Sequence, residues 1–152
     1  MEGCQDLAPG LMAILAEGQR IGLIGPAPLW SQVAHSRSFV FALSGADSRP
    51  RLDLGSGGGL PGLILAASQP EISWWLLDAR ERSVTFLESA VAVLGIQDST
   101  RILHGRAEDL GREEGWRGRF GVVTARNFGG PAETAECAAG FLGPGGLLVV
   151  SE

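Results

Sequence analysis

The spacing of glycines in residues 51–62, RLDLGSGGGLPG, is typical of a turn that binds a nucleotide-like ligand. Asp53, Gly55, Gly57 and Gly59 form a D-x-G-x-G-x-G pattern directly after a short apolar run. Such a turn needs glycine because the chain bends sharply and the ligand approaches the backbone where a Cβ atom would clash. The chemistry that this segment predicts is therefore the binding of a nucleotide-like cofactor.

The same loop satisfies two cofactor patterns. Gly57, Gly59 and Gly62 also form the G-x-G-x-x-G fingerprint of dinucleotide-binding domains, which indicates NAD. Asp53 favours S-adenosylmethionine, because a carboxylate there would repel a pyrophosphate and attract the ammonium group of a methionine moiety. We expect Asp53 to accept hydrogen bonds from loop amides or from that end of the ligand. A glycine turn without any ligand is the third alternative.

Two later segments carry further candidate ligand contacts. Asp78 ends a second apolar run downstream of Gly55, where related folds place the acid that holds the ribose hydroxyls. A helix N-cap is the structural alternative for Asp78, and both roles can hold together. Ala107 and Glu108 follow a third apolar run, where backbone groups and a carboxylate can contact the adenine edge. An acid in such a loop is otherwise simply solvated.

The elements that must position these residues alternate between strands and helices. Apolar stripes over residues 7–15 and 29–43 predict two N-terminal helices. We then expect strands over 51–54, 72–77, 101–103, 121–124 and 147–151, helices over 61–70, 84–94 and 131–141, and a turn over 143–146. This order predicts an α/β fold with a mostly parallel, Rossmann-like sheet. We expect one domain over 1–152, with N-terminal helices in 1–45 and the αβ core in 51–152.

Composition limits the classes of protein that fit. The chain has 152 residues, 45% of them hydrophobic, and a net charge of -5. These values suit one globular domain and argue against a domain that binds nucleic acid by itself, because such domains are usually basic overall. No apolar run is long enough to cross a bilayer, and the N-terminus lacks a secretory signal pattern. Cys4 and Cys137 are predicted to be reduced thiols, so we expect a cytoplasmic protein without a membrane association.

His35 and His104 are too far apart to indicate a metal site, and we expect both to pack or hydrogen-bond structurally.

Taken together, these residues resemble the GidB (RsmG) family, the guanine-N7 methyltransferases of small-subunit ribosomal RNA. The segments that carry the resemblance are LDLGSGGGLPG at 52–62, LLDARERSVTFL at 76–87, HGRAED at 104–109 and VVTARNF at 122–128, with GPGGLLVV at 143–150 shared by class I methyltransferases in general. The resemblance implies that Gly55 and Leu60 border S-adenosylmethionine, that Asp78 holds its ribose, and that Ala107 and Glu108 meet its adenine. Arg126 matches an arginine beside the methyl donor and is the catalytic candidate. A salt bridge at a strand end is the alternative for Arg126.

The family implies an enzyme of ribosomal RNA processing whose partner is small-subunit ribosomal RNA. This chain departs from the family at Asn127, where alanine is usual, at Gly121, where an acid is usual, and near residues 22–28, where the family's Asn-Leu-Thr segment has no counterpart. We expect the sheet to lack the last two strands of a class I methyltransferase, so that the chain is either a fragment or a reduced relative. The sequence does not indicate an oligomeric state.

The absence of a Ser/His/Asp set or a metal-ligand set fits this chemistry. Guanine N7 has a lone pair and no proton, so its methylation requires alignment and not a general base. Two other hypotheses stay open: a relative that binds S-adenosylmethionine or a protein partner without catalysis, and a NAD-dependent oxidoreductase. Phe128 and Trp30 have the chemistry to stack on a base, but we expect both to be buried in the core.

Overall fold

The computed structural model describes residues 7–151 as an α/β sandwich around one parallel sheet. The helices are α1 (Leu11–Arg20), α2 (Leu29–Ala42), α3 (Gly62–Ser68), α4 (Glu81–Leu94), α5 (Ala107–Leu110) and α6 (Pro131–Phe141). The strands are β1 (Arg51–Leu54), β2 (Trp74–Asp78), β3 (Thr100–His104), β4 (Phe120–Arg126) and β5 (Leu142–Ser151). The predicted fold class and the order of its main elements are confirmed, with the short helix α5 added.

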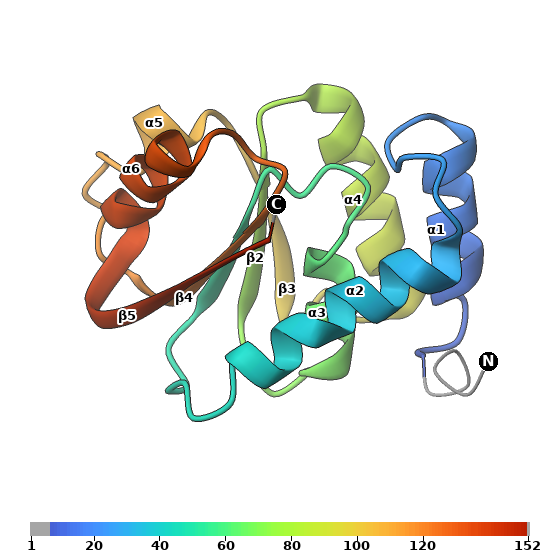
Figure 1. Ribbon diagram of the computed structural model, residues 1–152, viewed down its shortest axis with the longest axis horizontal. Coiled ribbons are helices and arrows are strands. Elements are labelled where there is room, and N and C mark those ends of the chain that lie inside the picture. Colours follow the sequence, from blue (N-terminus) through green and yellow to red (C-terminus); the bar gives the residue numbers. More distant parts are fainter. Residues whose placement is uncertain (1–6, 152) are drawn as a thin grey trace.

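The sheet has the strand order β3-β2-β1-β4-β5, and every neighbouring pair is parallel. Successive strands first move outward from β1 to β3, and the chain then returns to place β4 on the other side of β1. Helices α1 to α4 lie over one face of the sheet and helices α5 and α6 over the other (Figure 1). The side on which successive strands are added therefore changes between β1 and β4, and such a switch opens a crevice at the carboxyl ends of the strands.

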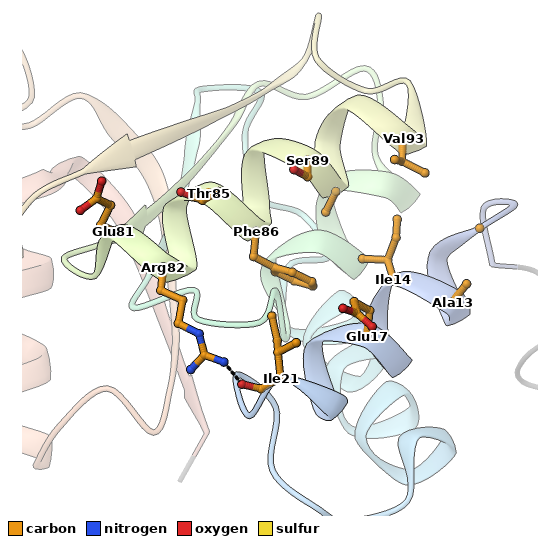
Figure 2. Close-up of a pocket in the computed structure, with 12 residues that line it drawn as sticks. Ala13, Ile14, Glu17, Ile21, Glu81, Arg82, Thr85, Phe86, Ser89 and Val93 are labelled. Atoms are coloured by element: carbon orange, nitrogen blue, oxygen red, sulfur yellow. Dashed lines mark hydrogen bonds between the residues drawn. The ribbon is translucent and has the colours of Figure 1, made fainter.

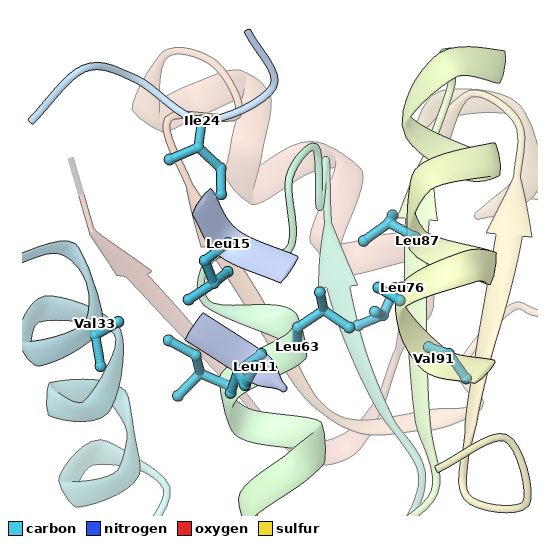
Figure 3. Close-up of a cluster of buried hydrophobic side chains, with 10 residues drawn as sticks. Leu11, Leu15, Ile24, Val33, Leu63, Leu76, Leu87 and Val91 are labelled. Atoms are coloured by element: carbon cyan, nitrogen blue, oxygen red, sulfur yellow. The ribbon is translucent and has the colours of Figure 1, made fainter. Parts of the chain in front are cut away.

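One hydrophobic core ties the N-terminal helices to the sheet (Figure 3). Leu11 and Leu15 of α1 pack with Val33 of α2, Leu63 of α3 and Leu87 of α4, and all five side chains are at most 2% exposed. Because α1 and α2 share this core with the sheet helices, their positions relative to the glycine loop are fixed by close packing.

The tandem tryptophans show that β2 is covered on both faces. Trp74 is fully buried beside Phe39 on the face that α2 and α3 cover. Trp75 points the other way and meets Trp116 edge to face, with their ring centroids 4.8 Å apart. Alternation of side chains along a strand produces this arrangement, and it explains the near-continuous apolar sequence of β2.

The glycines at 143–146 belong to a bulged strand and not to the separate turn that we predicted. β5 already pairs with β4 at Leu142, opposite Phe120, and the ladder resumes with Leu147 opposite Val122. A Cβ atom on Gly143 would lie 2.7 Å from the carbonyl oxygen of Gly118, so the bulge needs a residue without a side chain. The glycine cluster therefore indicates an irregularity within the strand rather than its start.

The prediction that Trp30 is buried is also wrong, because its side chain is 67% exposed. The buried residues of α2 are Gln32, Val33, Ser36 and Phe39, so two polar residues lie on the face that packs against the core. Between residues 7 and 151 there is no helix with the length and apolarity that crossing a bilayer requires. Cys137 is a free thiol, and Cys4 lies outside the described residues.

Candidate functional site

The glycine loop begins where β1 ends, at the point where the order of the strands changes side. Gly55, Gly57 and Gly59 have φ angles of 62°, 52° and 95°. This is left-handed backbone, which favours glycine. The amide of Ser56 donates to the carbonyl of Leu77 over 2.9 Å, so the loop is tied to the neighbouring strand β2. The predicted turn is therefore present, with its amides at the carboxyl end of the sheet.

Asp78 anchors the loop from the end of β2. Its Oδ2 accepts a 2.8 Å hydrogen bond from the amide of Gly57, and its Oδ1 accepts one of 2.9 Å from the amide of Arg80. The N-cap of α4 is Arg80 and makes no side-chain capping bond, so the N-cap alternative for Asp78 is wrong. The guanidinium of Arg80 approaches Asp78 at 3.4 Å and is largely exposed. It can therefore move away at little cost.

Asp53 lies beneath the loop and does not line the cleft above it. It is 1% exposed, and its Oδ1 accepts a 2.7 Å hydrogen bond from the hydroxyl of Thr124 on β4. Oδ2 has no hydrogen-bond partner within the described residues, and a Cβ on Gly62 would approach it to 2.5 Å. Burial raises the pKa of the Asp53 carboxyl to about 6, although the hydrogen bond from Thr124 acts in the opposite direction. The side chain thus supports the loop from below and is not positioned to contact a ligand above it.

A segment between α1 and α2, residues 23–27, covers the glycine loop, and we call it the roof. A Cβ atom on Gly58 would overlap Cγ1 of Ile24 and lie 3.0 Å from the carbonyl oxygen of Leu23, so the roof and the loop are in close contact. A cleft of about 320 Å³ lies where they meet. Its lining comprises the roof, Gln32 of α2 and, from the loop, the end of β4 and the segments that follow β2 and β4, Gly55, Ser56, Gly57, Gly58, Leu60, Arg80, Arg126 and Asn127.

Two glutamines hold the roof in place. The side-chain amide of Gln19 on α1 donates to the carbonyls of Gly25 and Ala27 over 2.7 and 2.8 Å. The side-chain amide of Gln32 on α2 donates to the same two carbonyls over 3.0 and 2.8 Å. Sequence reasoning missed both residues. For Gln32 the available signal was a polar side chain at a helix position that faces the core, which requires a hydrogen-bond partner.

Arg126 projects into the cleft from the end of β4. One guanidinium nitrogen, Nη2, donates a long hydrogen bond of 3.5 Å to Oε1 of Gln32. No acid among the described residues forms an ion pair with Arg126, so the alternative of a strand-end salt bridge finds no partner in that part of the chain. The guanidinium is half-buried and carries a positive charge that no protein carboxylate neutralises within the part of the chain described.

A second hollow adjoins the cleft at Asn127. This hollow measures about 530 Å³ and lies between the ends of β4 and β5 and the start of α6. Asn127 lines both spaces, and its φ of 52° is the sole positive value among non-glycine residues in the described chain. Phe128 lines the second hollow and lies over Gly55, where a Cβ atom would approach its ring to 2.8 Å. A strained residue between two adjoining spaces is typical of a functional site.

Ala107 and Glu108 are not brought into the cleft. The amide of Gly105 donates to the carbonyl of Asp78 over 3.1 Å, so the end of β3 does lie beside Asp78. Ala107 and Glu108 then begin α5 and line a separate hollow between α5 and α6. The carboxylate of Glu108 lies 3.7 Å from the guanidinium of Arg106 and is half-exposed. Both residues border the same edge of the sheet without facing the glycine loop.

The two histidines make the structural hydrogen bonds that we expected. Nε2 of His35 lies 2.5 Å from the hydroxyl of Ser151, and Nε2 of His104 lies 3.2 Å from the carbonyl of Ala79. A further hollow of about 1000 Å³ is an apolar groove between α1 and α4 (Figure 2). None of the predicted site residues lines this groove.

Comparison with known proteins identifies the family to which this site belongs. The family model GidB, described as rRNA small subunit methyltransferase G, matches residues 5–151. The chain belongs to the GidB family. It is 39% identical over 98 residues to the ribosomal RNA small subunit methyltransferase G of Moorella thermoacetica, an alignment that covers 64% of this chain and 40% of that protein. The resemblance inferred from the sequence motifs is therefore confirmed.

Longer alignments and the fold agree with membership of the GidB family. The enzyme of the same name from Frankia alni is 35% identical over 137 residues, covering 87% of this chain and 51% of the relative. The structure of a SAM-dependent methyltransferase from Thiobacillus denitrificans, in complex with S-adenosyl-L-homocysteine, superposes with a TM-score of 0.61 at 21% identity, covering 96% of this chain and 56% of that one. This confirms the predicted Rossmann-like methyltransferase fold. The chain spans about half the length of the curated relatives it matches.

Proposed function

We propose that this chain binds S-adenosylmethionine in the cleft beneath the roof and transfers its methyl group to N7 of a guanine in small-subunit ribosomal RNA. The observation that carries the proposal is the cleft itself. It lies at the point where the order of the strands changes side, between a glycine loop with left-handed backbone and an arginine without an acidic partner among the described residues. Membership of the GidB family and the S-adenosyl-L-homocysteine complex of the superposed methyltransferase support the same ligand.

The groups around the cleft fit the chemistry of this cofactor. Oδ2 of Asp78 accepts a hydrogen bond from the amide of Gly57, and Oδ1 accepts from the amide of Arg80 and, at 3.4 Å, from its exposed guanidinium. Once that guanidinium moves away, each oxygen can accept a second hydrogen bond, as ribose hydroxyls would supply. Gly55, Gly57 and Leu60 present backbone and apolar surface without acidic side chains. Arg126 offers a cation to the methionine carboxylate. In this proposal Gly59 and Asp53 shape and support the loop, and the adenine extends beyond Asp78 toward Ala107 and Glu108.

The reaction asks the protein chiefly to hold two ligands in line. When bound, S-adenosylmethionine would supply a methyl group on a positively charged sulfur. Attack by the lone pair of guanine N7 would break the carbon–sulfur bond, release S-adenosylhomocysteine and transfer the positive charge to the base, so no proton has to be removed. Among the carboxyl groups of the described residues, the one with a raised pKa is that of Asp53, and it lies below the loop, outside the cleft. Alignment of this kind can lower a barrier by roughly 7–11 kcal/mol. We assign the adjoining hollow at Asn127 to the acceptor base, with Phe128 as the ring on which it stacks.

Binding is tested first, by calorimetry and thermal shift with S-adenosylhomocysteine and, in parallel, with NAD. S-adenosylhomocysteine at 100 times its dissociation constant is expected to stabilise the chain by about 2.7 kcal/mol, whereas NAD is expected to have no effect. Asp78→Asn should weaken S-adenosylhomocysteine binding, and Asp98→Asn, a change at an exposed acid, should not. Stabilisation by NAD alone would refute the proposal.

Methyl transfer is tested with a labelled methyl donor and small-subunit ribosomal RNA. The matched control is the same RNA with 7-deazaguanine in place of guanine, which removes the N7 lone pair and leaves the rest of the base unchanged. We expect label in the guanine RNA and none in the deaza RNA. Equal labelling of both would show that N7 is not the acceptor.

A further inference from the structure

The contacts of Gln19 and Gln32 are alike at the roof and differ at Arg126. Both side-chain amides donate to the carbonyls of Gly25 and Ala27. Gln32 alone of the two also accepts a hydrogen bond, from Nη2 of Arg126. Gln19 is partly exposed on α1, whereas Gln32 is 6% exposed on α2 and lines the cleft. Gln32 therefore links the roof, the helix α2 and the cation of the cleft.

A neutral partner affects a guanidinium differently from an acid. A carboxylate at this position would form a charge-assisted pair with Arg126 and use up its positive charge. The carboxamide of Gln32 accepts one hydrogen bond, and the guanidinium keeps most of its N–H donors and its full charge. Among the described acids near the loop, Asp53 bonds to Thr124, and Asp78 bonds to Gly57 and Arg80, so neither pairs with Arg126.

We propose that Gln32 is a positioning residue that directs the charge of Arg126, which has no acid partner among the described residues, toward an anionic group of the ligand. That group is the carboxylate of the methyl donor or a phosphate of the RNA acceptor. The inference rests on the proposed function, because it requires that the cleft binds these ligands. Gln32 acts through Arg126 and needs no contact with the ligand, and Gln19 closes the roof without affecting the charge.

Paired substitutions separate the two roles of Gln32. Gln32→Glu and Gln19→Glu each remove two donors to the roof carbonyls and add one negative charge beside the roof. Only Gln32→Glu places that charge against Arg126, where it competes with an anionic ligand group. We expect Gln32→Glu to weaken ligand binding by about tenfold or more relative to Gln19→Glu, the loss typical of one charge-assisted hydrogen bond.

The choice of ligand identifies the anionic group. Calorimetry compares S-adenosylhomocysteine with 5′-methylthioadenosine, which lacks the amino-acid portion, and a filter assay measures binding of small-subunit ribosomal RNA. An effect on S-adenosylhomocysteine that is absent with methylthioadenosine assigns Arg126 to the carboxylate. An effect confined to RNA assigns it to a phosphate. Equal effects on both nucleosides with none on RNA would overturn the proposal, because no anionic group would then be involved.

A second pair of variants guards against misfolding at the buried position. Gln32→Leu and Gln19→Leu both lose the roof bonds, and only Gln32→Leu frees Arg126. We expect Gln32→Leu to bind the anionic ligand roughly two- to tenfold more weakly than Gln19→Leu, the cost of ordering one long side chain on binding. Thermal melting shows that each variant is folded.

The results also distinguish this inference from the proposed function. If the wild-type chain binds S-adenosylhomocysteine and the Gln32 variants match their Gln19 partners for every ligand, Gln32 has no positioning role and the inference fails alone. If the wild-type chain binds neither S-adenosylhomocysteine nor RNA, the proposed function fails and the inference fails with it.

Discussion

Burial of Asp53 makes a quantitative prediction about the pH dependence of stability. The structure raises the pKa of this carboxyl from 3.8 to about 6, a difference of about 2. Each pKa unit corresponds to about 1.36 kcal/mol, so the buried carboxyl is linked to roughly 3 kcal/mol of stability. Between these two pKa values the folded chain keeps a proton that the unfolded chain has released. The stability linked to this proton is therefore fully present below the unfolded pKa of 3.8 and is lost as pH rises through the folded pKa of about 6.

The assay compares the wild type with Asp53→Asn, which has a similar shape and cannot ionise. Urea unfolding at pH 4 and pH 7 gives the free energy of unfolding of each protein. Subtracting one protein from the other cancels the groups that titrate alike in both. Between these pH values, we expect the free energy of unfolding of the wild type to fall by roughly 2 kcal/mol relative to the variant. This is most of the roughly 3 kcal/mol that is linked to the carboxyl.

Thr124 provides a second check on the same reasoning. Its hydroxyl donates to Asp53 and holds the pKa of that carboxyl lower than burial alone would. Thr124→Val should therefore raise the pKa further and move the fall in stability to higher pH. A difference between the wild type and Asp53→Asn that stays constant from pH 4 to pH 7 would contradict the assignment of a buried, titrating carboxyl beneath the loop.

Three other changes test the contact of roof and loop, the core and the backbone at the end of α4. Gly58→Ala should weaken binding of S-adenosylhomocysteine and lower stability by about 1–3 kcal/mol, because its Cβ would overlap Ile24 of the roof, and Gly115→Ala, an exposed position outside the cleft whose Cβ meets open space, should change neither. A calorimetric titration that finds both variants equal would count against the close contact of roof and loop. Leu87→Ala should cost about 2–5 kcal/mol in urea unfolding because the side chain is fully buried. Gly95 has a φ of 69° and no atom crowds the space around it. Gly95→Ala should therefore cost about 1 kcal/mol through backbone strain alone, and an unchanged unfolding midpoint would show that this strain is absent.

Features that depend on residues close together in the sequence were predictable from the sequence. The helix Pro131–Phe141 has the predicted bounds, and α4 ends at the predicted Leu94, with Gly95 following it in the left-handed conformation. The glycine loop and Asp78 also lie where the strand pattern put them, at the carboxyl ends of β1 and β2. Each of these rests on local causes: the φ angles that glycine permits, the helical position that proline tolerates, and the alternation of side chains along a strand.

Other positions depended on which segments pack together, and the sequence carried no direct sign of them. Asp53 is close to Gly55 in sequence, yet the pleat of β1 turns its side chain below the loop, toward Thr124. Ala107 and Glu108 leave the end of β3 on the far side of Asp78, so they line a different hollow. A one-dimensional pattern gives the order of such residues but not the side of the sheet on which each side chain ends.

The sequence by itself determined the family, the α/β fold and the loop that opens the site, because these follow from local spacing and from motifs. Only the tertiary structure decided what closes the site and what holds its cation. The roof reaches the glycine loop because α1 and α2 share a core with α3 and α4, and Gln32 reaches Arg126 across 94 positions of sequence. A glutamine has no sequence signature for such a role, since its hydrogen-bond partners are defined only when distant segments are packed together.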